Sequence, residues 1–257
     1  MRVLILDDAR ARGSAVADIL AAAIEDGGGR TVLGLATGSS PLPAYRELIR
    51  RHREEGLSFA RVRAYLLDEY IGLPDGHPQA YREVIRRELT GALDIDPAAV
   101  HGPDGVHPDP AKAAVDYEAA LRADGPVAVQ LLGIGGNGHL GFNEPGSSLR
   151  STTRVVALTE RTRRDNARFF RSVAAVPRRV ITQGLGTICR AEHLVLMASG
   201  AGKAAAVAAA LEGPLSASCP ASVLQWHPRV TVVLDEAAAG ALRHGEHYRY
   251  AAACDLG

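Results

Sequence analysis

Hydrophobic positions along the chain fall into short runs that alternate with stretches of helical spacing. Runs rich in Val, Ile and Leu predict strands at residues 3–6, 31–36, 62–67, 127–134, 154–158, 193–198 and 229–234. Between the first two runs, Val16, Leu20 and Ala23 recur at helical spacing until Gly27 ends the helix. The same spacing predicts helices at residues 42–54, 79–89, 110–123, 159–170 and 202–211. Strands that alternate with helices in this way are typical of an α/β protein.

The run at residues 127–134 is almost continuously apolar, which is typical of a strand buried on both faces. The chain therefore predicts a largely parallel sheet inside a three-layer α/β/α sandwich. We find no repeat and no composition break, so residues 1–257 are expected to form a single domain, with a long loop at residues 96–110. In such a fold, ligands bind at the carboxyl ends of the strands.

Composition narrows the classes of function. The chain has 257 residues, with 29 Lys and Arg against 29 Asp and Glu, so its formal charge is zero. A nucleic-acid or anionic-membrane surface would need a basic excess, so no nucleic-acid or membrane partner is expected. No window is apolar enough to span a membrane, and the first apolar run is too short for a signal sequence. The three cysteines form no CxxC pair, which favours a reducing, cytoplasmic location.

The loop after the second predicted strand contains Thr37, Gly38, Ser39 and Ser40, followed by Pro41. Ser40 is a natural N-cap and Pro41 suits the first helical position, so hydroxyls, free N–H groups and the positive end of a helix should meet there. This combination predicts a phosphate site. It is not a Walker A loop, because no lysine follows the glycine at the required spacing. An ordinary strand-to-helix turn is the alternative for this segment alone.

The third predicted strand ends in two adjacent acids, Asp68 and Glu69. A carboxylate at the carboxyl end of a strand is well placed to act as a general base in an α/β enzyme. Neighbouring side chains in extended structure point to opposite sides, so only one of the two is expected to face the site. A solvated acidic turn is the alternative.

A glycine-rich loop follows the strand at residues 127–134. Gly133, Gly135 and Gly138 form a literal G-x-G-x-x-G, with Glu160 at about the spacing of a ribose-binding acid. A dinucleotide site would need a helix to begin at this motif. Gly141 and the Pro-Gly pair at 145–146 leave no room for one, so the dinucleotide interpretation is not favoured.

The same loop carries His139 and Glu144 on backbone that can approach a ligand closely. A carboxylate beside an imidazole fixes its tautomer and raises its basicity, which favours a proton shuttle. A metal site formed by these two residues and Asp68 is the alternative, but the chain lacks compact His/Cys ligand spacing, so no metal is expected.

Two further cations could reach a phosphate. Arg168 lies in a predicted helix, and Lys203 lies at the start of a helix that follows a strand. Solvated surface charges are the alternative for both.

Taken together and in this order, these segments resemble the glucosamine-6-phosphate deaminase family, whose superfamily of sugar-phosphate isomerases and lactonases has a modified Rossmann-like sheet. The matching pieces are Leu-Ala-Thr-Gly-Ser-Ser-Pro at 35–41, Leu-Asp-Glu-Tyr-Ile-Gly-Leu at 67–73, Gly-His-Leu-Gly-Phe-Asn-Glu-Pro at 138–145, Asn-Ala-Arg-Phe-Phe at 166–170 and Gly-Lys at 202–203. Related 6-phosphogluconolactonases share the phosphate loop and the Gly-His pair, whereas the Phe-Asn-Glu-Pro continuation resembles the deaminases.

The resemblance implies a role for each matching residue. Asp68 would move a proton between C2 and C1 of glucosamine 6-phosphate, and His139, oriented by Asn137 and Glu144, would assist opening of the pyranose ring. The products would be fructose 6-phosphate and ammonia, formed without a metal or an organic cofactor. The sugar phosphate would be held by a separate set of residues, namely Thr37, Gly38, Ser39, Ser40, Arg168 and Lys203. The family also implies a mobile lid at residues 158–182 and a possible homo-oligomer.

Two departures from the family pattern are visible. Asn137 stands where some members have aspartate, so it can orient His139 but supplies no charge. Val156 and Ala157 stand where a lysine and a threonine of an activator site would be expected, which argues against allosteric activation.

Three alternative functions stay open: a deaminase for an epimeric substrate such as galactosamine 6-phosphate, a lactonase, and a non-catalytic sugar-phosphate sensor. Retention of Asp68, His139 and Glu144 together argues against the sensor.

Overall fold

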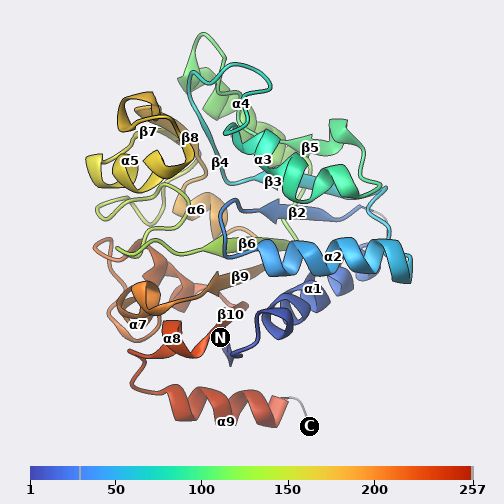
Figure 1. Cartoon of the computed structure of the whole chain (residues 1–257), viewed down its shortest axis with the longest axis vertical. Helices are drawn as coiled ribbons and strands as arrows, with labels where there is room; N and C mark the ends of the chain where they lie inside the picture. Colours follow the sequence, from blue (N-terminus) through green and yellow to red (C-terminus); the bar gives the residue numbers. More distant parts are fainter. Residues whose placement is uncertain (29, 256–257) are drawn as a thin grey trace.

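The computed structural model describes residues 1–28 and 30–255 (Figure 1). Within them, seven strands form a central sheet in the order β1-β10-β9-β6-β2-β3-β5, and every pairing is parallel. This confirms the predicted α/β class with a mostly parallel sheet. The strands are β1 (Arg2–Ile5), β2 (Val32–Leu35), β3 (Arg63–Leu66), β5 (Val100–His101), β6 (Val129–Gly133), β9 (His193–Ala198) and β10 (Val230–Leu234).

Helices occupy every position at which the sequence predicts one. The chain also has helices that its pattern does not reveal. Most are short, and the longest of them, at the C-terminal end, has no buried residue among residues 245–254. The helices are α1 (Ala9–Asp26), α2 (Leu42–Glu55), α3 (Tyr81–Glu88), α4 (Pro110–Ala123), α5 (Glu160–Asn166), α6 (Leu185–Ile188), α7 (Ala204–Glu212), α8 (Glu236–Ala239) and α9 (Gly245–Asp255), with 3₁₀ helices η1 (Thr90–Ala92), η2 (Pro97–Ala99), η3 (Ala167–Phe169), η4 (Val173–Ala175), η5 (Ala201–Lys203) and η6 (Pro220–Trp226). Within the described residues, no helix combines the length and the apolar character that a membrane crossing requires.

Successive side chains of the central strands enter two different cores, as the period of two in a strand requires. Leu131 of β6 packs with Val16, Leu20 and Leu48, which belong to α1 and α2. The next residue, Leu132, packs on the opposite face with residues of α4 and α7. The sheet is therefore covered on both faces, as its apolar strands predict.

A second, smaller sheet lies beside the first. It contains β4 (Asp68–Tyr70), β8 (Arg179–Thr182) and β7 (Arg154–Ala157), in the order β4-β8-β7, and both pairings are antiparallel. The predicted strand at 154–158 belongs here and not to the parallel sheet. The other two strands, β4 and β8, are only three and four residues long, too short to be recognised from hydrophobic pattern alone. One face of this sheet packs on α4, and the other lies under residues 158–176.

The segment at residues 96–110, expected to be a long loop, contains η2 and the edge strand β5. This strand is only two residues long, and it pairs with Ala64 and Tyr65 of β3. A strand that short has no alternating pattern of its own, so only its neighbour in the sheet defines it.

The strand order of the parallel sheet brings the loops that carry the candidate site residues to one edge of the sheet. From β2 the chain continues through β3 and β5 in one direction, and then returns to β6, β9 and β10 on the other side of β2. The reversal lies between β2 and β6, and ligands bind at such a switch point in open α/β sheets. The loops after β9, β6, β2 and β3 follow one another along this edge (Figure 1).

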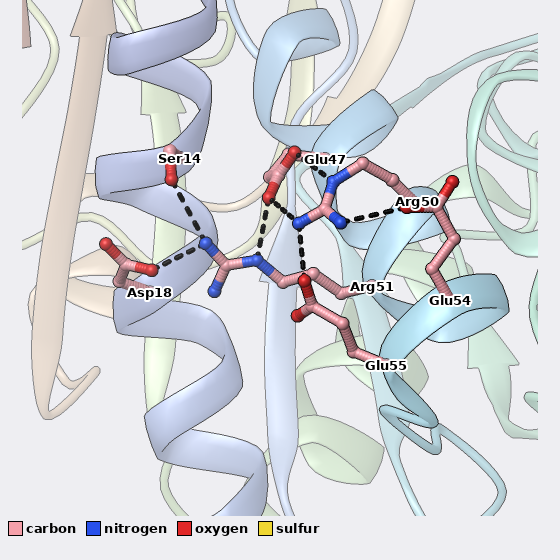
Figure 2. Close-up of polar contacts among 7 residues, drawn as sticks. All are labelled: Ser14, Asp18, Glu47, Arg50, Arg51, Glu54 and Glu55. Atoms are coloured by element: carbon pink, nitrogen blue, oxygen red, sulfur yellow. Dashed lines mark hydrogen bonds and ion pairs between the residues drawn. The ribbon is translucent and has the colours of Figure 1, made fainter.

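Helix α2, which follows the loop after β2, is fixed to α1 by a charged network (Figure 2). Glu47 accepts hydrogen bonds from Arg50 at 2.7 Å and from Arg51 at 2.9 Å. Arg51 also donates to Ser14 at 3.1 Å and to Asp18 at 2.6 Å, both on α1. The Arg50 guanidinium, with Arg51, lowers the pKa of Glu47 to about 2. The network fixes the position of the helix that carries the candidate phosphate loop.

Candidate active site

Residues 37–40 form an open turn between β2 and α2. Tyr45 of α2 is fully buried, and its hydroxyl donates to the carbonyl of Ala36 at 2.6 Å and accepts the N–H of Ala36 at 3.2 Å. These bonds hold the turn against its helix. Gly38 has a φ of +100°, in the left-handed region that favours glycine, and nothing occupies the space beside its α-carbon.

The prediction that Ser40 caps the helix is wrong. The cap position is held by Pro41, which makes no side-chain capping bond. Had Ser40 been the cap, the third helical residue would have been Pro43, which has no N–H for a serine oxygen to accept. In the described part of the chain, the hydroxyls of Thr37, Ser39 and Ser40 have no protein partner, so all three are available to a ligand.

Asp68 is the first residue of β4, and only Leu67 separates it from the end of β3. Its side chain is 6% exposed, and no hydrogen bond within the described residues reaches its carboxylate. Burial raises the pKa of Asp68 well above its usual range, and the charge of Glu69 raises it further. A buried, unbonded carboxylate with a raised pKa suits a general base near neutral pH.

Glu69 points away from Asp68 and has a structural task. Its carboxylate accepts the backbone N–H groups of Tyr70 at 2.8 Å, Tyr81 at 2.9 Å and Arg82 at 3.0 Å. Two of these belong to the first turn of α3, where N–H groups have no helical partner. The structure therefore separates the two acids as the extended backbone predicts: Glu69 anchors α3, whereas no group of residues 1–28 or 30–255 donates a hydrogen bond to the Asp68 carboxylate.

The loop after β6 passes close to Asp68. A β-carbon at Gly141, whose φ is +55°, would lie 3.3 Å from Oδ2 of Asp68 and 3.0 Å from the hydroxyl of Thr182. The Thr182 hydroxyl accepts the N–H of Phe142 at 3.2 Å. Residue 141 must therefore be small and flexible for the loop to approach the carboxylate.

Within the described chain, no helix begins directly after the G-x-G-x-x-G motif; residues 134–153 form turns, bends, isolated bridges and irregular backbone. The structural requirement for a dinucleotide site is absent, as the positions of Gly141 and Pro145 predict. The described residues also contain no group of three or more His, Cys, Asp or Glu side chains arranged to hold a metal ion.

His139, Asn137 and Glu144 form one hydrogen-bonded group in this loop. The Nδ1 atom of His139 lies 2.7 Å from Oδ1 of Asn137, and Nδ2 of Asn137 donates to Oε2 of Glu144 at 2.6 Å. The Nδ1 atom is 3.7 Å from the same carboxylate oxygen, so Asn137 stands between the ring and the acid. The neighbouring His139 ring lowers the pKa of Glu144 to about 2, and bonds from Thr162 and Asn137 contribute, against the opposing effect of burial.

Arg168 lies close enough to Lys203 for its charge to act on the lysine, although the two are 35 positions apart in the sequence. Arg168 lies in η3, with its guanidinium 4.7 Å from the centre of the Phe169 ring. Burial lowers the pKa of Lys203, and the charge of Arg168 lowers it further while Asp165 opposes this. The loop of Lys203 also meets the glycine-rich loop, because a β-carbon at Gly136 would lie 3.8 Å from the carbonyl of Gly202. Two neighbouring cations are an arrangement that favours an anionic ligand.

Sequence reasoning missed Thr162 and Tyr70. Thr162 of α5 donates a hydrogen bond of 2.5 Å to Oε1 of Glu144. The hydroxyl of Tyr70 accepts a hydrogen bond of 2.9 Å from Asn166, and the Tyr70 and Phe170 rings pack edge to face. Both residues connect the segment that carries Arg168 to the strand and loop that carry Asp68 and His139. Threonine near a helix start signals only a cap, so nothing in the local sequence pointed to these contacts.

Comparison with known proteins places the geometry in context. The family model of glucosamine-6-phosphate isomerases/6-phosphogluconolactonase matches residues 7–233. The chain is 57% identical over 251 residues to the glucosamine-6-phosphate deaminase of Rhodococcus opacus (strain B4), covering 98% of this chain and 96% of the relative. It is 56% identical over 250 residues to that of Arthrobacter sp. (strain FB24), covering 97% and 96%.

Solved structures agree with the sequence relatives. A monomeric glucosamine-6-phosphate deaminase superposes with a TM-score of 0.91 at 40% identity, covering 94% of this chain and all of that one (100%). The 6-phosphogluconolactonase of Trypanosoma brucei superposes with a TM-score of 0.75 at 20% identity, covering 94% of this chain and 98% of that chain. The second likeness shows the fold alone.

Proposed function

Because the chain belongs to the glucosamine-6-phosphate isomerase/6-phosphogluconolactonase family, we propose that it is a glucosamine-6-phosphate deaminase that converts its substrate and water to fructose 6-phosphate and ammonia. The observation that carries this proposal is the Asp68 carboxylate, which is buried, unbonded within the described residues and raised in pKa. A phosphate-binding protein needs no such base, and hydrolysis of a lactone removes no proton from carbon.

Substrate binding begins with the phosphate. The free hydroxyls of Thr37, Ser39 and Ser40, the backbone of Gly38, and the neighbouring cations Arg168 and Lys203 offer donors and positive charge for a dianion. In this proposal the phosphate fixes one end of the sugar, so that C1 and C2 lie near the loops that follow β3 and β6.

Ring opening is assigned to His139. Its Nδ1 faces the Asn137 oxygen, which can only accept a hydrogen bond, so Nδ1 carries the hydrogen and Nε2 keeps a lone pair. Nε2 can take the proton of the anomeric hydroxyl and return a proton to the ring oxygen as the C1–O5 bond breaks. This yields the open-chain amino aldehyde.

Isomerisation is assigned to Asp68. The carboxylate takes the C2 proton, the electrons of that C–H bond form the C1=C2 double bond, and the aldehyde oxygen takes a proton from the substrate's ammonium group, which gives the enolamine. The protonated Asp68 carboxyl then returns a proton to C1, and the nitrogen lone pair forms the C2=N bond of the protonated imine of fructose 6-phosphate. Water adds to the imine carbon, and ammonia leaves. The amine and aldehyde of the substrate supply the conjugation themselves, so the proposal uses no metal or organic cofactor.

We also propose that residues 158–178 form a lid over the bound sugar. They pack through a small core of their own around Tyr70, Phe142 and Leu158, apart from the two main cores. Residues 179–182 are better assigned to the body of the protein, because β8 is the middle strand of the second sheet.

We further propose a cytoplasmic location, which suits the three unpaired cysteines. A homo-oligomer stays an open alternative to the monomeric state described for one relative.

The deciding experiment measures ammonia and fructose 6-phosphate release from glucosamine 6-phosphate with a chelator present. Galactosamine 6-phosphate and 6-phosphogluconolactone are assayed in parallel. Equal release of the two products from the gluco substrate supports the proposal. Turnover of the galacto epimer alone would keep the mechanism and change the substrate, and turnover of the lactone alone would overturn both.

A further inference from the structure

Glu144 connects the catalytic loop to the first turn of α5. Its Oε1 accepts the hydroxyl of Thr162 at 2.5 Å, while its Oε2 accepts the amide of Asn137 at 2.6 Å. Each carboxylate oxygen thus has one short bond, and the two bonds come from different segments. Thr162 is 8% exposed, so water has little access to replace its hydroxyl.

From Thr162 to His139, the chemistry of each group determines the direction of these hydrogen bonds; the Thr159 hydroxyl lies 3.5 Å from Oε1 of Glu144, farther than its 2.9 Å to Thr162. A carboxylate can only accept hydrogen bonds, so the single hydroxyl proton of Thr162 is donated to Glu144. The Thr162 oxygen in turn accepts a hydrogen bond of 2.9 Å from the Thr159 hydroxyl. Asn137 must present its amide nitrogen to Glu144, which turns its oxygen toward Nδ1 of His139 at 2.7 Å. The bonds form a continuous chain from the start of α5 to the imidazole ring, and members of such a chain strengthen one another.

A competing arrangement lies close by. Oε2 of Glu144 is 3.7 Å from Nδ1 of His139, so a modest rotation of the carboxylate would pair it with the ring directly. That rotation would release the Asn137 amide, which could then turn its nitrogen toward the ring and favour the other tautomer. The Thr162 hydroxyl opposes the rotation by holding the second carboxylate oxygen.

We propose that Thr162 is a positioning residue for His139, which it holds in the ring-opening tautomer through Glu144 and Asn137. This inference rests on the proposed deaminase function. It also connects the lid to the chemistry, because Thr162 and Arg168 lie on the same short segment: when that segment sits over the phosphate, the Thr162 hydroxyl completes the hydrogen-bond chain.

The test is Thr162→Val, which keeps the β-branched shape and removes the hydroxyl. The helix cap survives, because the side chain of Thr159 accepts the N–H of residue 162 at 3.1 Å. Thr153→Val is the matched control: the Thr153 hydroxyl is also buried and donates to a carboxylate, that of Glu118, at 2.6 Å, in a cluster with Thr187 and Arg190 instead of the catalytic loop. Thr162→Ser restores the hydroxyl.

We expect Thr162→Val to lower kcat about 10-fold while KM changes less than about twofold, and Thr162→Ser to recover most of the loss. Long-range ¹H–¹⁵N NMR, with the His139 signal assigned by its loss in His139→Gln, should show the Nδ1-protonated ring in the wild type and a mixture of tautomers in Thr162→Val.

A kcat loss no larger than that of Thr153→Val, a rise in KM alone, or an unchanged tautomer would overturn the positioning role. Absence of ammonia release from the wild type would instead overturn the proposed function, and the NMR comparison would still test the hydrogen-bond chain.

Discussion

The imidazole ring of His139 lies directly against the α-carbon of Gly135, in space that the β-carbon of any other residue would occupy. A methyl group at position 135 would overlap the Cε1, Nδ1 and Nε2 atoms of the ring. The carbonyl of His139 also accepts the N–H of Gly135 at 2.9 Å, so the two residues are held together through the backbone as well. At the first glycine of the same motif, Gly133, no atom of the described part of the chain lies within 4 Å of the equivalent position.

We therefore expect Gly135→Ala to displace the imidazole and reduce kcat/KM by about 100-fold or more, since misplacement of a catalytic group by about 1 Å has that effect. Gly133→Ala is the matched control and should retain activity. The measurement is steady-state ammonia release from both variants, with circular dichroism to show that each is folded. Equal activity of the two variants would contradict the assignment of His139 to the reaction.

Asp68→Asn should bind glucosamine 6-phosphate but fail to exchange its C2 proton with solvent, because the amide cannot act as the base. Exchange is followed by NMR in deuterium oxide, and binding by calorimetry. Normal exchange in the variant would remove Asp68 from the mechanism.

The same variant should change the pH dependence of stability. Burial raises the folded-state pKa of Asp68 above its unfolded value, so ionisation of this group costs stability as pH rises through that window. The Tm of Asp68→Asn relative to wild type should therefore be higher at about pH 8 than at about pH 5. A Tm difference between the variant and the wild type that stays constant with pH would show that ionisation of the buried carboxylate does not destabilise the fold.

Lys203→Ala should raise KM for glucosamine 6-phosphate by about 10- to 100-fold, the effect expected when one charged hydrogen bond to a phosphate is lost. The chain provides a matched control, because Lys112 is its only other lysine. Lys112 lies exposed on α4 and pairs with Asp116 at 2.5 Å. Lys112→Ala should leave KM unchanged; an equal effect of both substitutions, or none from Lys203→Ala, would exclude Lys203 from phosphate binding.

Glu144→Gln should reduce stability at neutral pH. The folded-state pKa of Glu144 is about 2 instead of 4.5, so its ionised form stabilises the fold above about pH 4.5, and this contribution is lost as pH falls toward 2. The side chain is partly solvated, so we expect a loss of about 1–2 kcal/mol near pH 7 in urea unfolding, shrinking at about pH 3. The exposed Glu192→Gln serves as the control, and a Glu144→Gln loss that does not shrink in acid would contradict this account.

Most of the central fold was predictable from the sequence. The parallel strands and the longer helices each show their own hydrophobic period, and that period depends only on neighbours along the chain. The residues after β2, β3, β6 and β9 could be assigned to one edge of the sheet because parallel strands all end on the same side. The family resemblance added roles for Asp68 and His139 that the pattern alone left open.

The tertiary structure decided everything that depends on segments distant in the sequence. Strand β4 exists because Asp68 pairs with Thr182, more than a hundred residues away, and a three-residue strand has no detectable pattern of its own. The division of labour between Asp68 and Glu69, and the bond from Thr162 to Glu144, likewise follow from how separate segments pack. Local sequence determines the conformation that each segment prefers, whereas burial and hydrogen bonding across the packed fold determine which of its polar groups stay free for chemistry.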